Sequence, residues 1–173
     1  MNNQGLGHQG CRYLIDALKT ARKNSNKRGM NLEVFIAGRN RLENAGMKML
    51  AEFFGDGMSS LKKIVLLQNG IGVHGVDGIK DLILAIKNHV NLRILNISDN
   101  TIKPNGMKLL SEILPQFENL EEIYMSDCLI GNSGLDCLTG ILDCISYDLK
   151  TISVSGNEIK GKAAKKVNIF SLV

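Results

Sequence analysis

The feature that most constrains the fold of this chain is a short motif that occurs five times along it. In each copy, apolar residues stand at positions one, four, six and eleven, and position nine is asparagine or cysteine. The ninth positions are separated by 29, 31, 28 and 29 residues: Asn40, Asn69, Asn100, Cys128 and Asn157. Because a unit of this length cannot bury its own apolar side, we expect the units to stack and share one core.

Each copy predicts a short strand followed by a helix. Positions four and six lie on the inner face of the strand, and the residue between them faces the concave surface. Four residues after position eleven comes a glycine, followed four, seven and eight residues later by apolar residues at the period of a helix: Gly46, Gly75, Gly106 and Gly134. The pattern is typical of a leucine-rich repeat. It predicts an α/β, ribonuclease-inhibitor-like crescent with parallel strands on the concave face and helices on the convex face.

The residue at position nine has a structural task in this interpretation. The chain turns sharply after each strand, and an inward asparagine side chain can bond the free backbone groups of that turn. Cys128 is expected to take the same place as a small buried donor, with fewer hydrogen bonds.

The repeats predict a leucine-rich-repeat array over residues 1–160 and a short tail over 161–173. A partial repeat covers 1–31, and five repeats start near residues 32, 61, 92, 120 and 149. Gln4 and Leu6 stand where the asparagine and leucine belong, but no strand motif precedes them, so we expect a fragment without its N-terminal repeats. Asn3 would then lie on a frayed chain end.

A basic connection precedes the first full repeat. Lys19–Asn31 carries five cationic residues and no acid. We interpret it as a solvated helix extension and loop rather than as a contact for an acidic partner, although the sequence leaves both open.

Composition excludes several classes of protein. The net charge of +4 is low for a nucleic-acid-binding protein, and no run of 18 apolar residues predicts a membrane span. The four cysteines form no CxxC pair and the three histidines are scattered, so we predict free thiols, a reducing compartment, and neither metal nor cofactor. Phosphate-binding, nucleophile-elbow and metal-binding motifs are missing, which indicates a protein-binding solenoid rather than a self-contained enzyme.

One row of residues is the candidate binding site. Each stands just before an inward position-nine residue, where the chain leaves the strand and stays in solvent: Asn3, Arg39, Gln68, Asp99, Asp127 and Gly156. Because neighbouring strands lie about 4.8 Å apart, Asn3 to Asp127 would span roughly 20 Å along one rim. A row of this kind fits the binding of a protein partner. Alternatively, the residues are polar only because the start of each loop is exposed to solvent.

The amino-acid sequences of the repeats resemble those of the Ran GTPase-activating protein family. The segments that carry this resemblance are Asn2-Asn3-Gln4-Gly5-Leu6-Gly7, Gly38-Arg39-Asn40-Arg41-Leu42-Glu43-Asn44, Gln68-Asn69-Gly70-Ile71, Asp99-Asn100-Thr101, Asp127-Cys128-Leu129 and Gly156-Asn157-Glu158-Ile159. The resemblance extends over residues 1–160. Family members carry further repeats before this point and an acidic segment after the array.

The resemblance implies stimulation of GTP hydrolysis by the small GTPase Ran in its GTP form, with the hydrolysing site in the partner. It further implies a monomer acting in the cytoplasm or at the cytoplasmic side of the nuclear envelope. By chemistry alone, Arg39 and Arg41 are candidates for an arginine finger. The family is understood to order Ran's own catalytic machinery instead, and Asn3 matches its catalytic asparagine. Arg39, Arg41, Asn44, Gln68, Asp99 and Asp127 are then expected to bind Ran, although Arg41 and Asn44 also fit local bonding within a turn.

Two other hypotheses remain. The first is a non-catalytic protein-binding scaffold similar to ribonuclease inhibitor, which the uniform spacing and basic balance disfavour. The second is a solenoid fragment without activity of its own.

Overall fold

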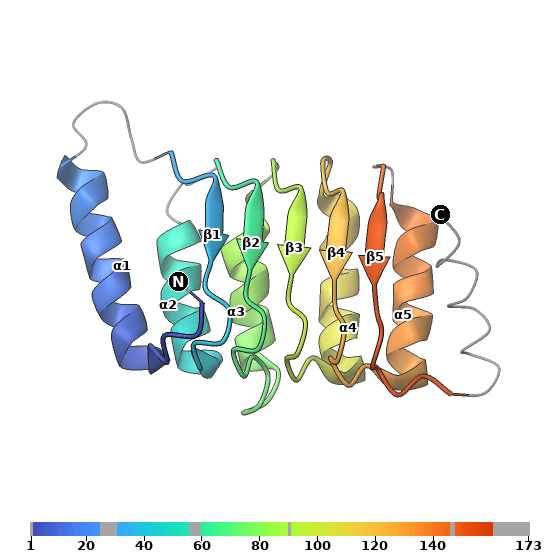
Figure 1. Cartoon of the computed structure of the whole chain (residues 1–173). Helices are drawn as coiled ribbons and strands as arrows, with labels where there is room; N and C mark the ends of the chain where they lie inside the picture. The colour runs from blue at the N-terminus through green and yellow to red at the C-terminus, as the bar shows by residue number, and fades with distance from the viewer. Residues whose placement is uncertain (1, 25–30, 56–59, 90, 146–147, 161–173) are drawn as a thin grey trace.

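Five parallel strands form one sheet, and the helices cover one of its two faces (Figure 1). The computed structural model describes residues 2–24, 31–55, 60–89, 91–145 and 148–160. The strands are β1 (Val34–Ile36), β2 (Lys63–Val65), β3 (Ile94–Asn96), β4 (Glu122–Tyr124) and β5 (Thr151–Ser153), and they lie in chain order. The helices are α1 (Gly7–Asn24), α2 (Glu43–Gly55), α3 (Asp77–Ile86), α4 (Lys103–Ser111) and α5 (Gly131–Cys144), with a 3-10 turn at Leu114–Gln116.

The register of the sheet places equivalent repeat positions side by side. Phe35 pairs with Ile64, Ile64 with Leu95, Leu95 with Ile123, and Ile123 with Ile152. These are the fourth positions of the five copies. Because the register follows the repeat spacing, every inward residue meets its counterpart in the next repeat. The predicted α/β leucine-rich-repeat solenoid is confirmed.

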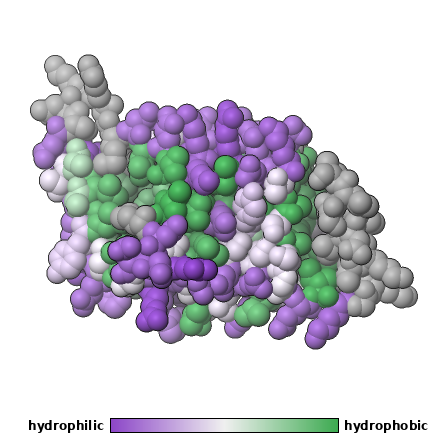
Figure 2. All heavy atoms as spheres, viewed as in Figure 1, coloured by the Kyte–Doolittle hydropathy of each residue, from purple (hydrophilic) through white to green (hydrophobic). Residues whose placement is uncertain are grey.

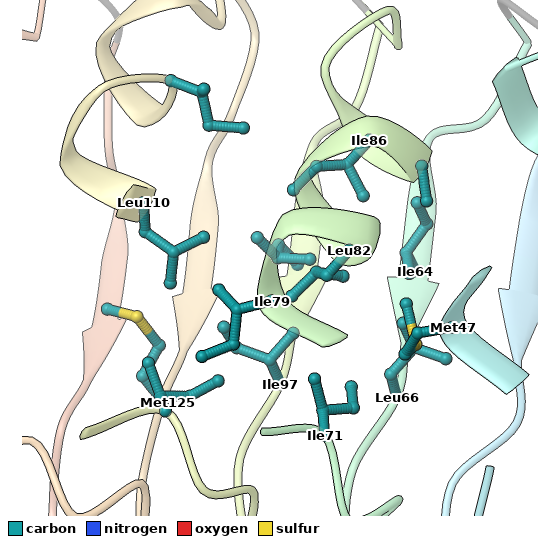
Figure 3. Packing of buried hydrophobic residues seen from close by; sticks show 14 of the residues in the cluster. Met47, Ile64, Leu66, Ile71, Ile79, Leu82, Ile86, Ile97, Leu110 and Met125 are labelled. Atoms are coloured by element: carbon teal, nitrogen blue, oxygen red, sulfur yellow. The ribbon is translucent and has the colours of Figure 1, made fainter. Parts of the chain in front are cut away.

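The core fills the space between the sheet and the helices. Ile64 and Leu66 point from the strand layer toward Met47 of α2 and Leu82 of α3, as Figure 3 shows, and all four are at most 1% exposed. Burying an aliphatic side chain of this size contributes about 1.5–3 kcal/mol. The stack of such layers therefore supplies a core that no single repeat has.

The repeat that starts near residue 61, the third when the partial repeat is counted, departs from the predicted position of the helical glycine. Gly46, Gly106 and Gly134 are buried inside helices, whereas Gly75 is exposed with φ of 98° and lies before α3. The expectation that Gly75 occupies the same helical position was wrong. This repeat has the longest spacing of the five copies, and residues 71–74 use the surplus to form an extra turn.

The two ends of the array are described in part. α1 continues through Lys19, Arg22 and Lys23, which confirms the helical extension that the basic segment predicted. The rest of that segment over 25–30, and the predicted tail over 161–173, lie outside the described residues. In the described part of the chain no helix has the length and apolar content of a membrane span.

Candidate functional site

The six residues of the predicted row lie side by side across the sheet, at the carboxyl ends of the strands. We name them the rim row: Asn3, Arg39, Gln68, Asp99, Asp127 and Gly156. All six are exposed, and all have φ between 52° and 68°. A backbone in this left-handed region turns the chain away from the strand and directs the side chain outward. The predicted solvent exposure of the row is confirmed.

Backbone hydrogen bonds connect the first five rim residues to the following repeat. The N–H of Asn3 donates to the carbonyl of Gly38 at 2.9 Å, and that of Arg39 to Leu67 at 2.7 Å. The same bond recurs from Gln68 to Ser98, from Asp99 to Ser126 and from Asp127 to Ser155, at 2.8–3.0 Å. The backbone of the row is therefore a continuous ladder, and its side chains are held at fixed spacing.

Beneath the rim, the position-nine asparagines form a second ladder. Asn69 accepts the backbone N–H of Asn40 through Oδ1 at 3.1 Å and donates through Nδ2 to the carbonyl of Ala37 at 2.8 Å. Asn157 accepts the N–H of Cys128 at 2.7 Å in the same way. All of these residues are buried, so the bonds satisfy turn groups that water cannot reach. The predicted role of position nine is confirmed.

Cys128 fills its asparagine position in the predicted manner. Its Sγ lies 3.3 Å from the carbonyl oxygen of Ile97 and 3.4 Å from that of Ser126, so that its one proton is shared between two acceptors. Burial raises the pKa of this thiol to about 11, so it stays protonated and remains a donor at neutral pH.

Asn3, the first residue of the rim row, is held by more hydrogen bonds than the sequence predicted. Besides the bond from Asn3 to Gly38, the side-chain Oδ1 of Asn2 accepts the N–H of Gly38 at 2.8 Å. Gln4 donates its backbone N–H to Asn40 Oδ1 at 3.1 Å and its side-chain Nε2 to the carbonyl of Asn2 at 3.1 Å. The expectation of a frayed Asn3 was therefore wrong. Sequence reasoning missed Asn2, because an asparagine two residues before position nine has no counterpart in the other repeats.

The rim carries opposite charges on its two halves. Arg39 and Arg41 project at β1, and Asp99 and Asp127 project at β3 and β4; all four are exposed. Within the described ranges, neither arginine takes part in an ion pair or a side-chain hydrogen bond. The guanidinium groups therefore have their donors available for a partner.

Asn44 differs from the other predicted contacts. Its Oδ1 accepts the N–H of Gly72 at 3.2 Å, and its Nδ2 lies 3.5 Å from the carbonyl of Gly75. The side chain also packs against Gly78, at the start of α3. These contacts tie the first turn of α2 to the loop before α3, 28 and 31 residues further along the chain, and are therefore bonds between repeats rather than the local bonding within a turn that the sequence left open.

A neighbouring side-chain contact braces the same loop from outside. His74 Nε2 lies 3.2 Å from Glu43 Oε2, and both side chains are largely exposed. Such a pair contributes at most about 1 kcal/mol. Two side chains of the first turn of α2, Glu43 and Asn44, therefore hold this loop in place.

Comparisons with known proteins bear on the repeat and on the family that it resembles. A family model described as Leucine Rich repeat matches residues 88–111. Over 106 residues the chain is 37% identical to Ran GTPase-activating protein 1 of Saccharomyces cerevisiae, covering 61% of this chain and 26% of that protein. It is 38% identical over 94 residues to Ran GTPase-activating protein of Drosophila melanogaster, covering 53% and 15%. It is 44% identical over 73 residues to Ran GTPase-activating protein 1 of Xenopus laevis, covering 41% and 12%.

The resemblance that the repeat wording indicated is confirmed by these three matches. The chain spans only between 12% and 26% of the length of the three relatives.

Proposed function

We propose that this leucine-rich-repeat solenoid, which is similar to Ran GTPase-activating proteins, stimulates GTP hydrolysis by the small GTPase Ran. The observation that carries the proposal is the rim row. It presents two amides, a guanidinium and two carboxylates, all exposed, on a backbone fixed by one hydrogen bond per repeat from Asn3 to Asp127. Groups held at fixed positions before binding lose little entropy when a partner docks.

Asn3 is the residue that we assign to catalytic positioning. Its backbone is bonded to Gly38, and its side chain is exposed, with no hydrogen bond among the described residues. In the proposed mechanism this amide contacts the switch region of Ran and helps to order the glutamine that orients the attacking water. The bond that breaks lies in the GTP of the partner, and this chain supplies only positioning.

The arginines have a binding role in this mechanism and do not act as a finger. Arg39 and Arg41, with Gln68, Asp99 and Asp127, would contact complementary charges on Ran. Asn44 would act indirectly, because its amide is used within the chain. The proposed partner is the GTP form of Ran, met by a monomer of this protein in the cytoplasm or at the cytoplasmic side of the nuclear envelope.

Single-turnover hydrolysis tests the proposal. Ran loaded with GTP is mixed with an excess of this chain, and binding is recorded in parallel. We expect binding together with an acceleration of at least about tenfold over Ran alone. Binding without acceleration would replace the activator with a non-catalytic scaffold, and failure to bind would overturn the proposal altogether.

Two variants test the assignment of Asn3. Asn3→Gly removes the amide and keeps a residue suited to φ of 59°. Its control is Asn88→Ala. Asn88 is an exposed residue beyond the last turn of α3, on the side of the amino ends of the strands and away from the rim row. We expect Asn3→Gly to lower the hydrolysis rate at saturation by about tenfold or more and Asn88→Ala to leave it unchanged. Equal rates for the two variants would remove Asn3 from the mechanism.

A further inference from the structure

The face of the sheet turned away from the helices divides into two chemically different halves. Over β1–β3 it carries five aliphatic side chains, which we name the aliphatic patch: Val34, Ile36, Val65, Leu67 and Ile94. Over β3–β5 the same rows carry the carboxylate of Glu122 and otherwise amide and hydroxyl groups: Asn96, Ser98, Tyr124, Ser126, Thr151, Ser153 and Ser155. Figure 2 shows the first half in green and much of the second half in paler shades.

The register of the strands brings the patch together. Val34 pairs with Lys63, which pairs with Ile94, and Ile36 pairs with Val65. Val34 is 49% exposed, and the other four members are only half-buried. Parallel sheets are usually covered on both faces, and here the aliphatic half has no cover among the described residues. An accessible cluster of this kind indicates an interaction surface.

Cations border the patch at both ends along the strands. At the amino ends, Lys63 stands between Val34 and Ile94 and takes part in no ion pair within the described part of the chain. At the carboxyl ends, Arg39 is also without an ionic partner there. Acids stand on the side of the other half: Glu122 of β4 pairs with Ile94, and Asp99 and Asp127 are exposed at the carboxyl ends of β3 and β4.

The shape of the patch suits a helix. Three strands about 4.8 Å apart are about 10 Å wide, which is close to the 10–12 Å diameter of a helix with its side chains. From Val34 to the level of Leu67 the patch extends by four residues, or about 13 Å along the strands, which is the length of about nine helical residues. An extended peptide is narrower and would leave part of the patch uncovered.

We propose that the aliphatic patch docks an amphipathic helix of a partner protein whose apolar stripe is flanked by acidic residues. The stripe would pack on Val34, Val65 and Leu67, while its acids would meet Lys63 at one end and Arg39 at the other. Asp99 and Asp127 would repel the same acids, which confines the helix to β1–β3. This surface is separate from the contacts proposed for GTP hydrolysis, apart from Arg39.

A designed peptide pair tests the proposal on the full chain. The probe is a stapled helix of about twelve residues with leucine at i, i+3, i+4 and i+7 and glutamate at the outer positions. Its twin carries lysine in place of each glutamate. We expect the glutamate peptide to shift the methyl resonances of Val34, Val65, Leu67 and Ile94 and to bind at least about tenfold more tightly than the twin. Equal binding of both peptides, or shifts confined to other surfaces, overturns the proposal.

Matched substitutions in one row of the sheet sharpen the test. Val34→Asp and Thr151→Asp place the same carboxylate at equivalent positions of β1 and β5. The first should weaken binding of the glutamate peptide by about tenfold, and the second by less than about twofold. In Lys63→Glu the preference for the glutamate peptide over its lysine twin should reverse. This variant also keeps the proposal testable if Val34→Asp fails to fold. Loss of equal size in Val34→Asp and Thr151→Asp, or an unchanged preference in Lys63→Glu, contradicts the proposal.

Discussion

The side-chain Oδ1 of Asn100 accepts a 3.0 Å hydrogen bond from the backbone N–H of Asn69, which holds the same place in the preceding repeat. It also accepts the N–H of Ile71 at 3.0 Å. Its Nδ2 donates to three carbonyls, those of Leu66, Ile97 and Ser98. One buried amide thus satisfies backbone groups of two repeats.

Loss of this amide should therefore destabilise the array as a whole. In Asn100→Ala, two buried donors and three buried acceptors lose a partner, and we expect a loss of roughly 3 kcal/mol in the free energy of unfolding. Urea denaturation followed by circular dichroism measures it. Asn88→Ala, at an exposed position, should change stability by less than about 0.5 kcal/mol. The ladder would have no energetic role if both variants unfolded at the same urea concentration.

Backbone strain gives a second test, at two glycines. Gly72 has φ of 81°, and a methyl group there would collide with the carbonyl of Thr101. Gly140 lies inside α5 with open space around it. Gly72→Ala should cost several kcal/mol or prevent folding, whereas Gly140→Ala should stabilise the fold by about 0.5–1 kcal/mol. Thermal melting compares them, and tolerance of Gly72→Ala would contradict the close contact.

The buried thiols should react slowly. Burial raises the pKa of Cys11 and of Cys128 to about 11, whereas Cys144 is exposed. Because only the thiolate is nucleophilic, a disulfide reagent at pH 8 should modify Cys144 quickly and the two buried thiols only after unfolding. Mass spectrometry of the labelled peptides identifies the sites. Rapid labelling of Cys128 in the folded protein would mean that its turn opens readily.

The same two thiols predict a loss of stability at alkaline pH. In the unfolded chain they ionise near their ordinary pKa of 9.0, and in the folded protein near 11. Their contribution is fully present below pH 9 and is lost as the pH rises toward 11, because ionisation then favours the unfolded state. Urea midpoints at pH 8 and pH 10.5 measure this loss. In Cys11→Ala/Cys128→Ala the difference between the two midpoints should be smaller.

The role of Arg39 in binding predicts a kinetic signature. Arg39→Asn removes the charge and keeps a residue that tolerates φ of 58°. We expect slower association with GTP-loaded Ran at low salt, a smaller salt dependence, and an unchanged hydrolysis rate at saturation. Stopped-flow measurements separate these quantities, with Lys87→Asn, at the end of α3, as the control. A fall of about 10³-fold or more at saturation would instead indicate an arginine finger.

Much of this architecture could be predicted because each position of the repeat has one structural role, either to be buried in the core or to bond the backbone of a turn. The inward fourth positions, such as Phe35 and Ile64, and the inward asparagines, such as Asn69, follow from the periodicity. The extra turn before α3 could not be placed in this way. Its signal was the 31-residue spacing, but the spacing does not say where the two surplus residues go, and Gly75 was misplaced.

The candidate site was predicted in position and only partly in detail. Exposure of the rim row follows from its place before an inward residue, which is a local property of each turn. The internal bonding of Asn44 and the support that Asn2 gives to Gly38 depend on distances between residues 28 or more apart. A linear pattern does not contain those distances.

The repeat that first constrained the fold determined, by itself, the solenoid, its inward residues and the rim. The period of the apolar positions was sufficient, because only stacking can bury them. Tertiary structure alone decided that Lys63 stands between Val34 and Ile94 and that Ile36 lies beside Val65. The physical reason is the register of the parallel strands, which makes neighbours of residues about 29 positions apart and collects their side chains into one surface.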